Sequence, residues 1–246
     1  MTKPVFVVDR LDGVGPECVV DGPEGRHAVA VKRLRPGEEV VLTDGRGRWT
    51  EGAVKAAEGK DRLVVAGLEP VREEPPESPR ITVVQALPKG DRGELAVETM
   101  TEVGVDAIVP WAASRCVTQW KGERGLKALG KWRATAREAG KQSRRVRFPE
   151  VAEAASTKQV AALLAGADFA AVLHESGQAP LATAELPAEG EIVLVVGPEG
   201  GVSPEELALF ADAGARAYVL GRTVLRTSTA GTAAAALLLG RTGRWS

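Results

Sequence analysis

Short apolar runs separated by turn residues fill the first part of the chain. Their alternation and their β-branched residues predict strands, with turns at Asp12-Gly13 and Asp44-Gly45. One short helix is predicted at 26–34, where Pro36-Gly37 stops it. The predicted strands are 5–8, 17–20, 39–42, 49–54 and 63–68. Several short strands with one helix favour a small β-barrel over residues 1–70.

A stretch rich in proline and glutamate follows this barrel. Residues 71–79 have no apolar periodicity, which predicts a linker. Beyond it, apolar runs alternate with helical patterns, an arrangement typical of a mostly parallel sheet covered by helices. We expect strands at 81–87, 107–109, 169–173, 192–196 and 217–220, and helices at 93–103, 123–142, 157–164, 204–213 and 228–239. The sequence thus predicts a second, α/β domain over residues 80–246.

Three of these helices carry recognisable end signals. Ser156 and Ser203 each precede a predicted helix, and a serine hydroxyl can accept a hydrogen bond from the exposed amides of the first turn. Gly104 follows another helix, at the position where a left-handed residue closes it. The helix boundaries at these three points are therefore the best defined.

Cysteine content and hydropathy restrict the class of protein. Two thiols, Cys18 and Cys116, provide neither a disulfide framework nor a zinc-binding spacing among 246 residues, which fits a reducing cytoplasm. The longest apolar stretch, 233–239, is far shorter than the roughly 20 residues of a membrane helix. We expect a soluble cytoplasmic protein with no membrane partner and no metal.

Positive charge is concentrated in one segment although the net charge is only −1. Residues 115–147 hold 11 lysines and arginines and two acidic residues, with Trp120 and Trp132 among them. Such a block is typical of a face that binds nucleic-acid phosphates, and interleaved aromatics can stack on bases. The alternative is an ordinary solvated helix face. We favour RNA or another polyanion as the partner.

Common catalytic motifs are missing from the sequence. It has no P-loop, no GxGxxG after its first α/β strand, no HExxH and no GxSxG. What remains are three strand ends, at 173–175, 196–201 and 220–226, and ligands bind beyond the carboxyl ends of parallel strands. The loop GPEGG at 197–201 is unsuited to phosphate, because proline removes an amide donor and glutamate adds negative charge. It better fits an uncharged ring such as the adenine of S-adenosylmethionine, and the alternative is a tight turn without a ligand.

The strand-end motifs resemble those of a known family. Residues 195–206 read VVGPEGGVSPEE and residues 220–230 read LGRTVLRTSTA, which is similar to the RsmE family of bacterial 16S rRNA uridine-N3 methyltransferases. Earlier stretches are similar to that family in the same order, at 27–47, 87–111, 138–151 and 173–176. The resemblance therefore spans nearly the whole chain.

This resemblance implies a fold, a reaction and partners. The fold would be α/β, a SPOUT-type methyltransferase domain with a C-terminal trefoil knot, preceded by a small PUA-like β-barrel. The reaction would be methylation of N3 of a specific uridine in 16S rRNA with S-adenosyl-L-methionine as cofactor. The partners would be that rRNA, within the small ribosomal subunit, and a second copy of the chain in a homodimer.

The resemblance also assigns roles to individual residues. Those expected to bind the cofactor are Leu173, His174, Glu175, Val196, Gly197, Pro198, Glu199, Gly200, Gly201, Leu220, Gly221, Val224, Leu225 and Arg226. Those expected to bind RNA are Arg115, Lys131, Arg137, Lys141, Gln142, Ser143, Arg144 and Arg145. Arg145 and Arg226 are the candidates for a catalytic cation that stabilises the uracil anion.

The chain departs from the family at a few positions. Ser228 stands where the family often has glutamate, and we expect it to cap the last helix. Arg144 stands where glycine is common.

Two other functions stay open: a SPOUT methyltransferase for another rRNA or tRNA site, and a non-catalytic RNA-binding protein. The second would leave the three strand-end motifs without a purpose.

Overall fold

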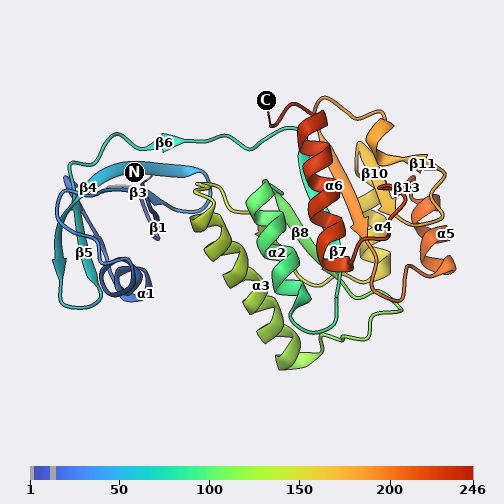
Figure 1. The fold of residues 1–246 in the computed structure, drawn as a ribbon, viewed down its shortest axis with the longest axis horizontal. Coiled ribbons are helices and arrows are strands. Elements are labelled where there is room, and N and C mark those ends of the chain that lie inside the picture. Colours follow the sequence, from blue (N-terminus) through green and yellow to red (C-terminus); the bar gives the residue numbers. More distant parts are fainter. Residues whose placement is uncertain (1–2, 12–14, 246) are drawn as a thin grey trace. The chain divides into compact units, whose positions relative to one another are not determined.

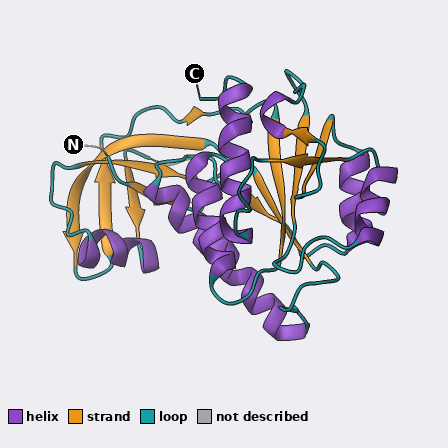
Figure 2. Ribbon diagram, turned by 45° about the vertical axis from the view of Figure 1, so that its right-hand side comes forward, coloured by secondary structure: helices purple, strands orange, loops and turns teal. Residues whose placement is uncertain are grey.

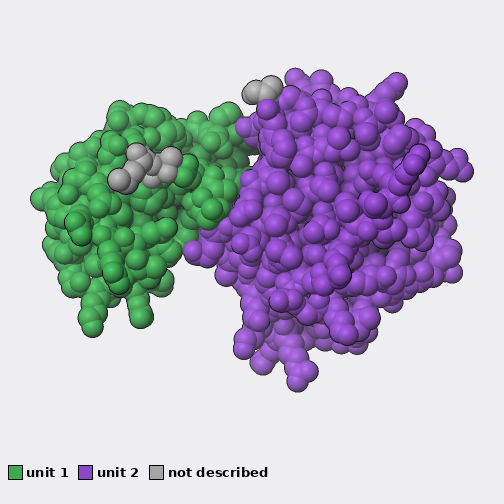
Figure 3. Space-filling model, viewed as in Figure 1, with its two compact units in different colours: residues 1–76, 140–148 green, residues 77–139, 149–246 purple. Residues whose placement is uncertain are grey.

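The computed structural model of the chain describes residues 3–11 and 15–245, which form two compact units (Figure 3). Residues 1–76 and 140–148 make up the N-terminal unit, and residues 77–139 and 149–246 make up the C-terminal unit. The sequence did not indicate that residues 140–148 belong with the N-terminal unit. The predicted turn at Asp12-Gly13 lies outside the described residues.

All five strands predicted for the N-terminal unit are present, in a sheet of order β1-β3-β4-β5-β2. Strand β1 runs parallel to β3, and the other neighbours are antiparallel. The elements are β1 (Val5–Val7), β2 (Glu17–Val20), α1 (Gly22–Arg26), a π-helix (His27–Val31), β3 (Glu39–Thr43), β4 (Arg48–Glu58), β5 (Arg62–Ala66) and β6 (Arg72–Glu73). Their inward side chains form one core that includes Phe6, Leu42 and Leu63.

Two expectations for this unit are corrected. The helix predicted at 26–34 begins earlier, at Gly22, where Pro23 occupies the first turn, and its second half is a π-helix that ends at Val31. The predicted linker is not entirely without structure. Its residues Arg72 and Glu73 form β6, which pairs with the start of β4. The guanidinium of Arg72 lies 4.7 Å from the centre of the Trp49 ring, so a cation–π contact stabilises the short strand.

The segment 140–148 joins the N-terminal unit through backbone hydrogen bonds. The amide of Gly47 donates to the carbonyl of Val146 (3.0 Å), and the amide of Phe148 donates to the carbonyl of Gly45 (2.9 Å). The segment therefore pairs with the turn between β3 and β4. Pairing across about 100 residues of sequence leaves no local signal, which is why periodicity alone could not detect it.

The C-terminal unit is built on a parallel sheet of order β11-β13-β10-β12-β7-β8-β9, as the alternating pattern predicted. Its strands are β7 (Arg80–Ala86), β8 (Ala107–Trp111), β9 (Glu150–Val151), β10 (Phe169–Leu173), β11 (Ala179–Pro180), β12 (Glu191–Val196) and β13 (Arg216–Val219). Its helices are α2 (Arg92–Val103), α3 (Gly122–Gln142), α4 (Thr157–Ala165), the short 3₁₀ turn Leu181–Thr183, α5 (Pro204–Asp212) and α6 (Thr227–Arg241). The two-residue strands β9 and β11 were not predicted.

Helices cover both faces of this sheet, as Figures 1 and 2 show. Helices α2, α3 and α6 pack on the face that contains Val83, and α4 and α5 pack on the face that contains Val84. Since neighbouring residues of a strand point to opposite faces, a sheet covered on both sides needs continuous apolar strands. Helices α2 and α6 lie side by side, with the hydroxyls of Thr99 and Thr232 2.6 Å apart.

The predicted helix ends are confirmed. Ser156 and Ser203 each form a capping box, in which the serine hydroxyl accepts from an amide and the side chain three residues later accepts from the serine amide. Gly104 closes α2 with a φ of +109°. These signals were reliable because each depends on residues within one turn.

The end of α3 is a helix-terminating motif with an unusual residue. The amide of Arg144 donates to the carbonyl of Lys141 (3.2 Å), and the amide of Arg145 donates to the carbonyl of Gly140 (2.9 Å). These are the two bonds of a Schellman motif, with Arg144 at the position that is usually glycine. Its φ is +61°, in the left-handed region. The glycine common here in the RsmE family fits this backbone, whereas arginine strains it.

We predict that Arg144→Gly raises the free energy of unfolding by about 0.5–1 kcal/mol. Relief of a left-handed side chain is worth about 1–2 kcal/mol, and the greater entropy of unfolded glycine offsets part of it. Urea denaturation measures the difference. Arg144→Ala is the matched control, because it removes the same charge and keeps the strain. Equal stability of the two variants would contradict this account.

Candidate functional site

The carboxyl ends of β13, β10 and β12 meet at one edge of the sheet. These strands are neighbours and run parallel, and Leu173 pairs in register with both Val196 and Tyr218. The loops that follow them surround a cavity of about 580 Å³. Every residue that the resemblance assigns to the cofactor lines this cavity, from Leu173 to Arg226. We call it the strand-end cavity.

The loop after β12 needs glycine for two separate reasons. A Cβ on Gly197 would lie 2.8 Å from Cγ2 of Val202, too close for any side chain without movement of its neighbour. Gly201 has a φ of +74° and donates its amide to the carbonyl of Pro198 (2.9 Å). The loop is therefore a tight turn whose outer surface faces the cavity without side chains at Gly197 and Gly201.

A buried carboxylate holds the base of this loop. Glu206, with an exposed fraction of 5 %, accepts from the amides of Ser114 (2.8 Å) and Ser203 (3.0 Å) and from the hydroxyl of Thr157 (3.1 Å). These donors come from three separate segments. The start of α5, and with it the glycine loop, is thereby fixed to the loop after β8 and to α4.

Charges of both signs line the cavity. Arg115 donates from Nη1 to the carbonyl of Gly200 (3.1 Å), and the amide of Lys89 donates to Oε1 of Glu199 (3.2 Å). His174 lies with Nδ1 2.7 Å from the hydroxyl of Ser176 and accepts from the Ser176 amide (3.2 Å). The remaining charged lining residues are Arg92, Glu175, Arg222 and Arg226.

Sequence reasoning missed part of the lining. The missed residues are Arg92, Val202, Tyr218, Val219, Arg222, Thr223, Thr227 and Ala230. Arg222 and Thr223 lie within an assigned motif, so their position was a sufficient signal. Arg92 opens α2 and reaches the cavity because β7 pairs with β12, which no local pattern indicates. Arg115, expected to bind RNA, also lines the cavity.

The two catalytic candidates lie in different units. Arg226 is the N-cap residue of α6 and is exposed at the cavity, which Thr227 of the first turn also lines. Arg145 belongs to the N-terminal unit, and its Nε donates to the carbonyl of Arg147 (2.9 Å). The assignment of Arg145 stays a prediction.

Ser228 does not cap the last helix, and this expectation was wrong. The N-cap is Arg226, and Ser228 is already the second residue of the helix. Its side chain has an exposed fraction of 1 %, and its Oγ has no partner among the described residues. The hydroxyl points into the protein rather than back to the helix amides, because the N-cap lies two residues earlier than expected, at Arg226.

The residues expected to bind RNA divide into three groups. Arg115, Lys131 and Arg137 lie in the C-terminal unit, where Lys131 is exposed. Gln142, Ser143, Arg144 and Arg145 lie in the N-terminal unit, at and after the end of α3. Lys141 has an exposed fraction of 8 %, and its Nζ lies 2.9 Å from Oε1 of Glu24. Its ammonium is already neutralised, so we leave Lys141 out of the RNA surface.

The two tryptophans of the basic segment differ from the expected stacking pair. Trp132, on α3, has an exposed fraction of 2 % and packs in the core against Gly93 of α2. Trp120 is half-buried and meets Trp132 edge to face, with ring centres 5.0 Å apart. Only Trp120 retains indole surface that a base could reach.

The thiols offer no nucleophile to this site. Burial raises the pKa of Cys116, which follows Arg115, above the value of a free cysteine, and burial does the same for Cys18. A smaller thiolate fraction at neutral pH means low reactivity.

Across residues 3–11 and 15–245, no helix is both long and apolar enough to cross a membrane.

Comparison with known proteins defines the class. Residues 76–239 match the model of an RNA methyltransferase domain, and residues 20–66 match that of an RNA methyltransferase PUA domain. Fold and cavity together are thus those of an RNA methyltransferase.

Individual relatives define the family within that class. The ribosomal RNA small subunit methyltransferase E of Mycobacterium bovis is 46 % identical over 100 % of this chain and 94 % of its own length. The enzyme of that name from Neisseria gonorrhoeae, solved with bound S-adenosyl methionine, has a TM-score of 0.83 and 28 % identity, with 98 % of each chain covered. A methyltransferase of Legionella pneumophila, also solved with this cofactor, has a TM-score of 0.85 and 26 % identity over 98 % of each chain. The chain belongs to the RsmE family of ribosomal RNA small subunit methyltransferases, which confirms the resemblance.

We predict that Glu206→Ala lowers the free energy of unfolding by about 2–4 kcal/mol, because it leaves buried donors without an acceptor. Thermal or urea denaturation measures the loss. Glu205→Ala is the control on the same helical turn. The pKa of Glu205 is lowered, chiefly by the hydrogen bond of a backbone amide and then by the Ser203 hydroxyl, yet its carboxylate is exposed. A similar loss in both variants would refute the structural role of Glu206.

Proposed function

We propose that this chain transfers a methyl group from S-adenosyl-L-methionine to N3 of a specific uridine in 16S rRNA of the small ribosomal subunit. The observation that carries the proposal is that every residue assigned to the cofactor by motif meets in the strand-end cavity. Those residues come from three loops separated by up to about fifty positions of sequence. The name shared by its relatives, and the cofactor in two solved relatives, support the same reaction.

The cavity suits S-adenosylmethionine chemically. That molecule combines an uncharged adenine with a carboxylate, an ammonium and a sulfonium. Arg92, Arg115 and Arg222 can neutralise the carboxylate, and Glu175 and Glu199 can face the cations. The glycines after β12 leave backbone groups free to approach the adenine edge. A volume of about 580 Å³ lies within the usual range for small-molecule sites.

The bound cofactor supplies an electrophilic methyl group for direct displacement, and the protein must prepare the nucleophile. Uridine N3 carries a proton near neutral pH, and this proton must pass to solvent water before N3 forms its bond to the methyl carbon as the bond from that carbon to sulfur breaks. The reaction therefore needs stabilisation of the uracil anion that remains. Arg226 places a cation at the cavity, and it sits at the positive end of α6. Both features favour negative charge at the same point, which is the role of a preorganised anion site. Arg145 is proposed as a second cation from the N-terminal unit.

The remaining residues hold the substrate. The PUA domain and the segment around Gln142, Ser143 and Arg144 are proposed to orient the RNA, while Lys131 and Arg137 contact its phosphates. The target base must be exposed or unstacked before N3 can enter the cavity. We place the reaction in the cytoplasm.

The homodimer and the trefoil knot implied by the resemblance belong to this proposal. A dimer would let one protomer bring RNA to the cavity of its partner. Sedimentation velocity of the purified protein tests it, and a monomer at micromolar concentration would remove the dimer from the mechanism. The knot stays a prediction.

Deletion of the gene is predicted to remove 3-methyluridine from small-subunit rRNA, as measured by mass spectrometry of its nucleosides. Restoring the gene on a plasmid should restore the nucleoside. Loss of a different methylated nucleoside would support a SPOUT methyltransferase with another target. No change in any nucleoside, together with no cofactor binding, would favour the non-catalytic RNA-binding protein.

Arg226→Ala is predicted to slow single-turnover methyl transfer by about a hundredfold to a thousandfold, the usual effect of removing one donor to a developing anion. Rates are taken at saturating cofactor and RNA, so that lost affinity does not enter. Arg226→Lys should recover part of the rate, because it keeps the charge. An unchanged rate in Arg226→Ala would exclude this residue from catalysis.

A further inference from the structure

A second cavity, of about 430 Å³, opens in the C-terminal unit. The loop between β7 and α2, the segment that follows β8 and the first turns of α3 line it. Of the residues that motif comparison assigned to cofactor or RNA, only Lys131 belongs to its lining. We call it the α3 cavity.

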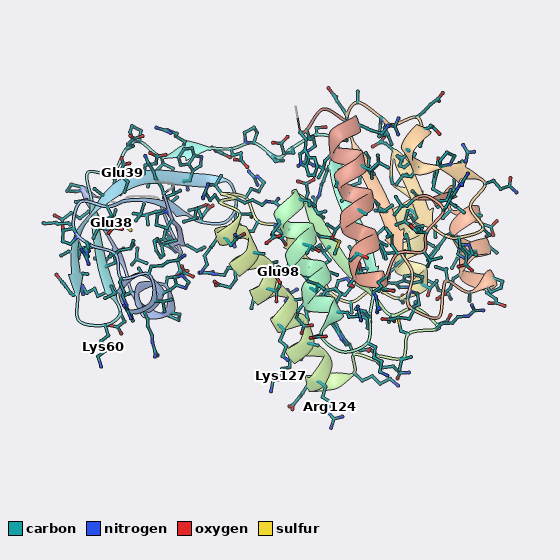
Figure 4. The ribbon with its side chains drawn as sticks, viewed as in Figure 1. Glu38, Glu39, Lys60, Glu98, Arg124 and Lys127 are labelled. Carbon is teal, nitrogen blue, oxygen red and sulfur yellow. The ribbon has the colours of Figure 1, made fainter. Side chains whose placement is uncertain are left out.

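One wall of the α3 cavity is strongly positive. Arg124, Lys127 and Lys131 follow one another at intervals of three and four residues, so they lie on the same side of α3. All three are exposed, and Figure 4 shows Arg124 and Lys127 extending from the first turns of the helix. Within residues 3–11 and 15–245, none of the three has an ion-pair or hydrogen-bond partner. Glu94 on the opposite wall cancels only one of these charges.

An aromatic surface forms the floor of this cavity. Trp132 is fixed in the core, where a Cβ on Gly93 would lie 2.7 Å from its ring. Trp120 stands edge to face against it and is half-buried, so part of its indole faces the cavity. The hydroxyl of Thr118 donates to the carbonyl of Pro88 (2.8 Å) and ties the two sides of the cavity together. These contacts hold Trp120 and Trp132 in place at the floor of the cavity.

The two cavities share a wall. The loop that follows β7 contributes Pro88 and Gly90 to the α3 cavity, while the amide of Lys89 between them binds Glu199 of the strand-end cavity. At the start of α2, Arg92 lines the strand-end cavity and Gly93 lines the α3 cavity. The two cavities therefore lie next to each other in the C-terminal unit.

We propose that the α3 cavity binds a nucleotide of the substrate RNA that lies close to the methylated uridine. Cations on one wall suit a phosphodiester, and the exposed part of Trp120 suits stacking of a base. The inference rests on the proposed function, since it takes RNA as the substrate. It adds a site whose residues bind RNA without touching the cofactor.

The test compares Arg124→Gln, Lys127→Gln and the double variant with Lys158→Gln. Lys158 is an exposed lysine of α4, on the other face of the sheet, and provides the matched loss of charge. Affinity for unmethylated small-subunit rRNA is measured between about 50 and 200 mM salt, where phosphate contacts dominate the dependence. Affinity for S-adenosylmethionine is measured on each variant by calorimetry.

Each single variant is expected to weaken RNA binding about threefold to tenfold. The salt slope, which is the slope of log affinity against log salt concentration, should become shallower by about 1 in each single variant and by about 2 in the double variant. Lys158→Gln should match the unmodified protein, and cofactor affinity should stay constant throughout. The double variant could instead keep the RNA affinity and the salt slope of the unmodified protein, while the unmodified protein still methylates rRNA. That result would overturn the proposal that the α3 cavity binds RNA and would leave the proposed function intact. Absence of methyl transfer to rRNA by the unmodified protein would instead overturn the proposed function.

Stacking on Trp120 is tested separately with an RNA that lacks the base next to the target uridine. The unmodified protein should lose at least about fivefold in affinity for this abasic RNA. Trp120→Leu should bind the intact RNA more weakly than the unmodified protein does. Removal of the base should then lower the affinity of this variant little further, because the substitution and the missing base remove the same interaction. Equal losses in both proteins would show that this base does not contact Trp120.

Discussion

Parallel pairing of β13, β10 and β12 is the constraint on which the rest of the C-terminal unit depends. Parallel neighbours place all their carboxyl ends at one edge, so three loops that are distant in sequence start side by side. A parallel sheet also needs helices on both faces, and its strands must then be apolar throughout. Residues 192–196 meet that requirement with five aliphatic side chains. The chemistry is thereby left to the loops, which explains why every motif assigned to the cofactor lies at the end of a strand.

Sequence predicted best those features that depend on residues close together. The strand Phe169–Leu173 was predicted to the residue, and both serine caps were found because a capping box is completed within four positions. The glycines after β12 were assigned from the resemblance, and the structure shows that Gly197 and Gly201 are needed by the tight turn that they form. Where the local signal was weaker, as at the π-helix His27–Val31, the predicted bounds moved by several residues.

Features that depend on distant pairing could not be predicted. Arg92 reaches the strand-end cavity only because β7 lies beside β12, and residues 140–148 join the N-terminal unit only through bonds to the turn after β3. Ser228 illustrates the opposite error, in which a local capping rule was applied two residues too late along the chain. The helix begins at Thr227, so the serine that looked like a cap lies inside it and is buried.

The basic segment 115–147 shows most clearly how the structure adds to what the sequence predicted. The basic segment reads as one block, yet its cations have different partners. Lys141 is paired with Glu24, and Arg133 binds both Glu153 (2.9 Å) and the carbonyl of Val151 (3.1 Å), so these two stabilise the fold. Arg124 and Lys127, with Lys131 on the same side of α3, lack such neighbours among the described residues. An unpaired surface cation costs the folded state little and keeps its full charge for a phosphate, whereas a paired one must first break a bond. The basic segment therefore offers fewer free cations to phosphates than its sequence suggests, since Lys141 and Arg133 are already paired within the fold.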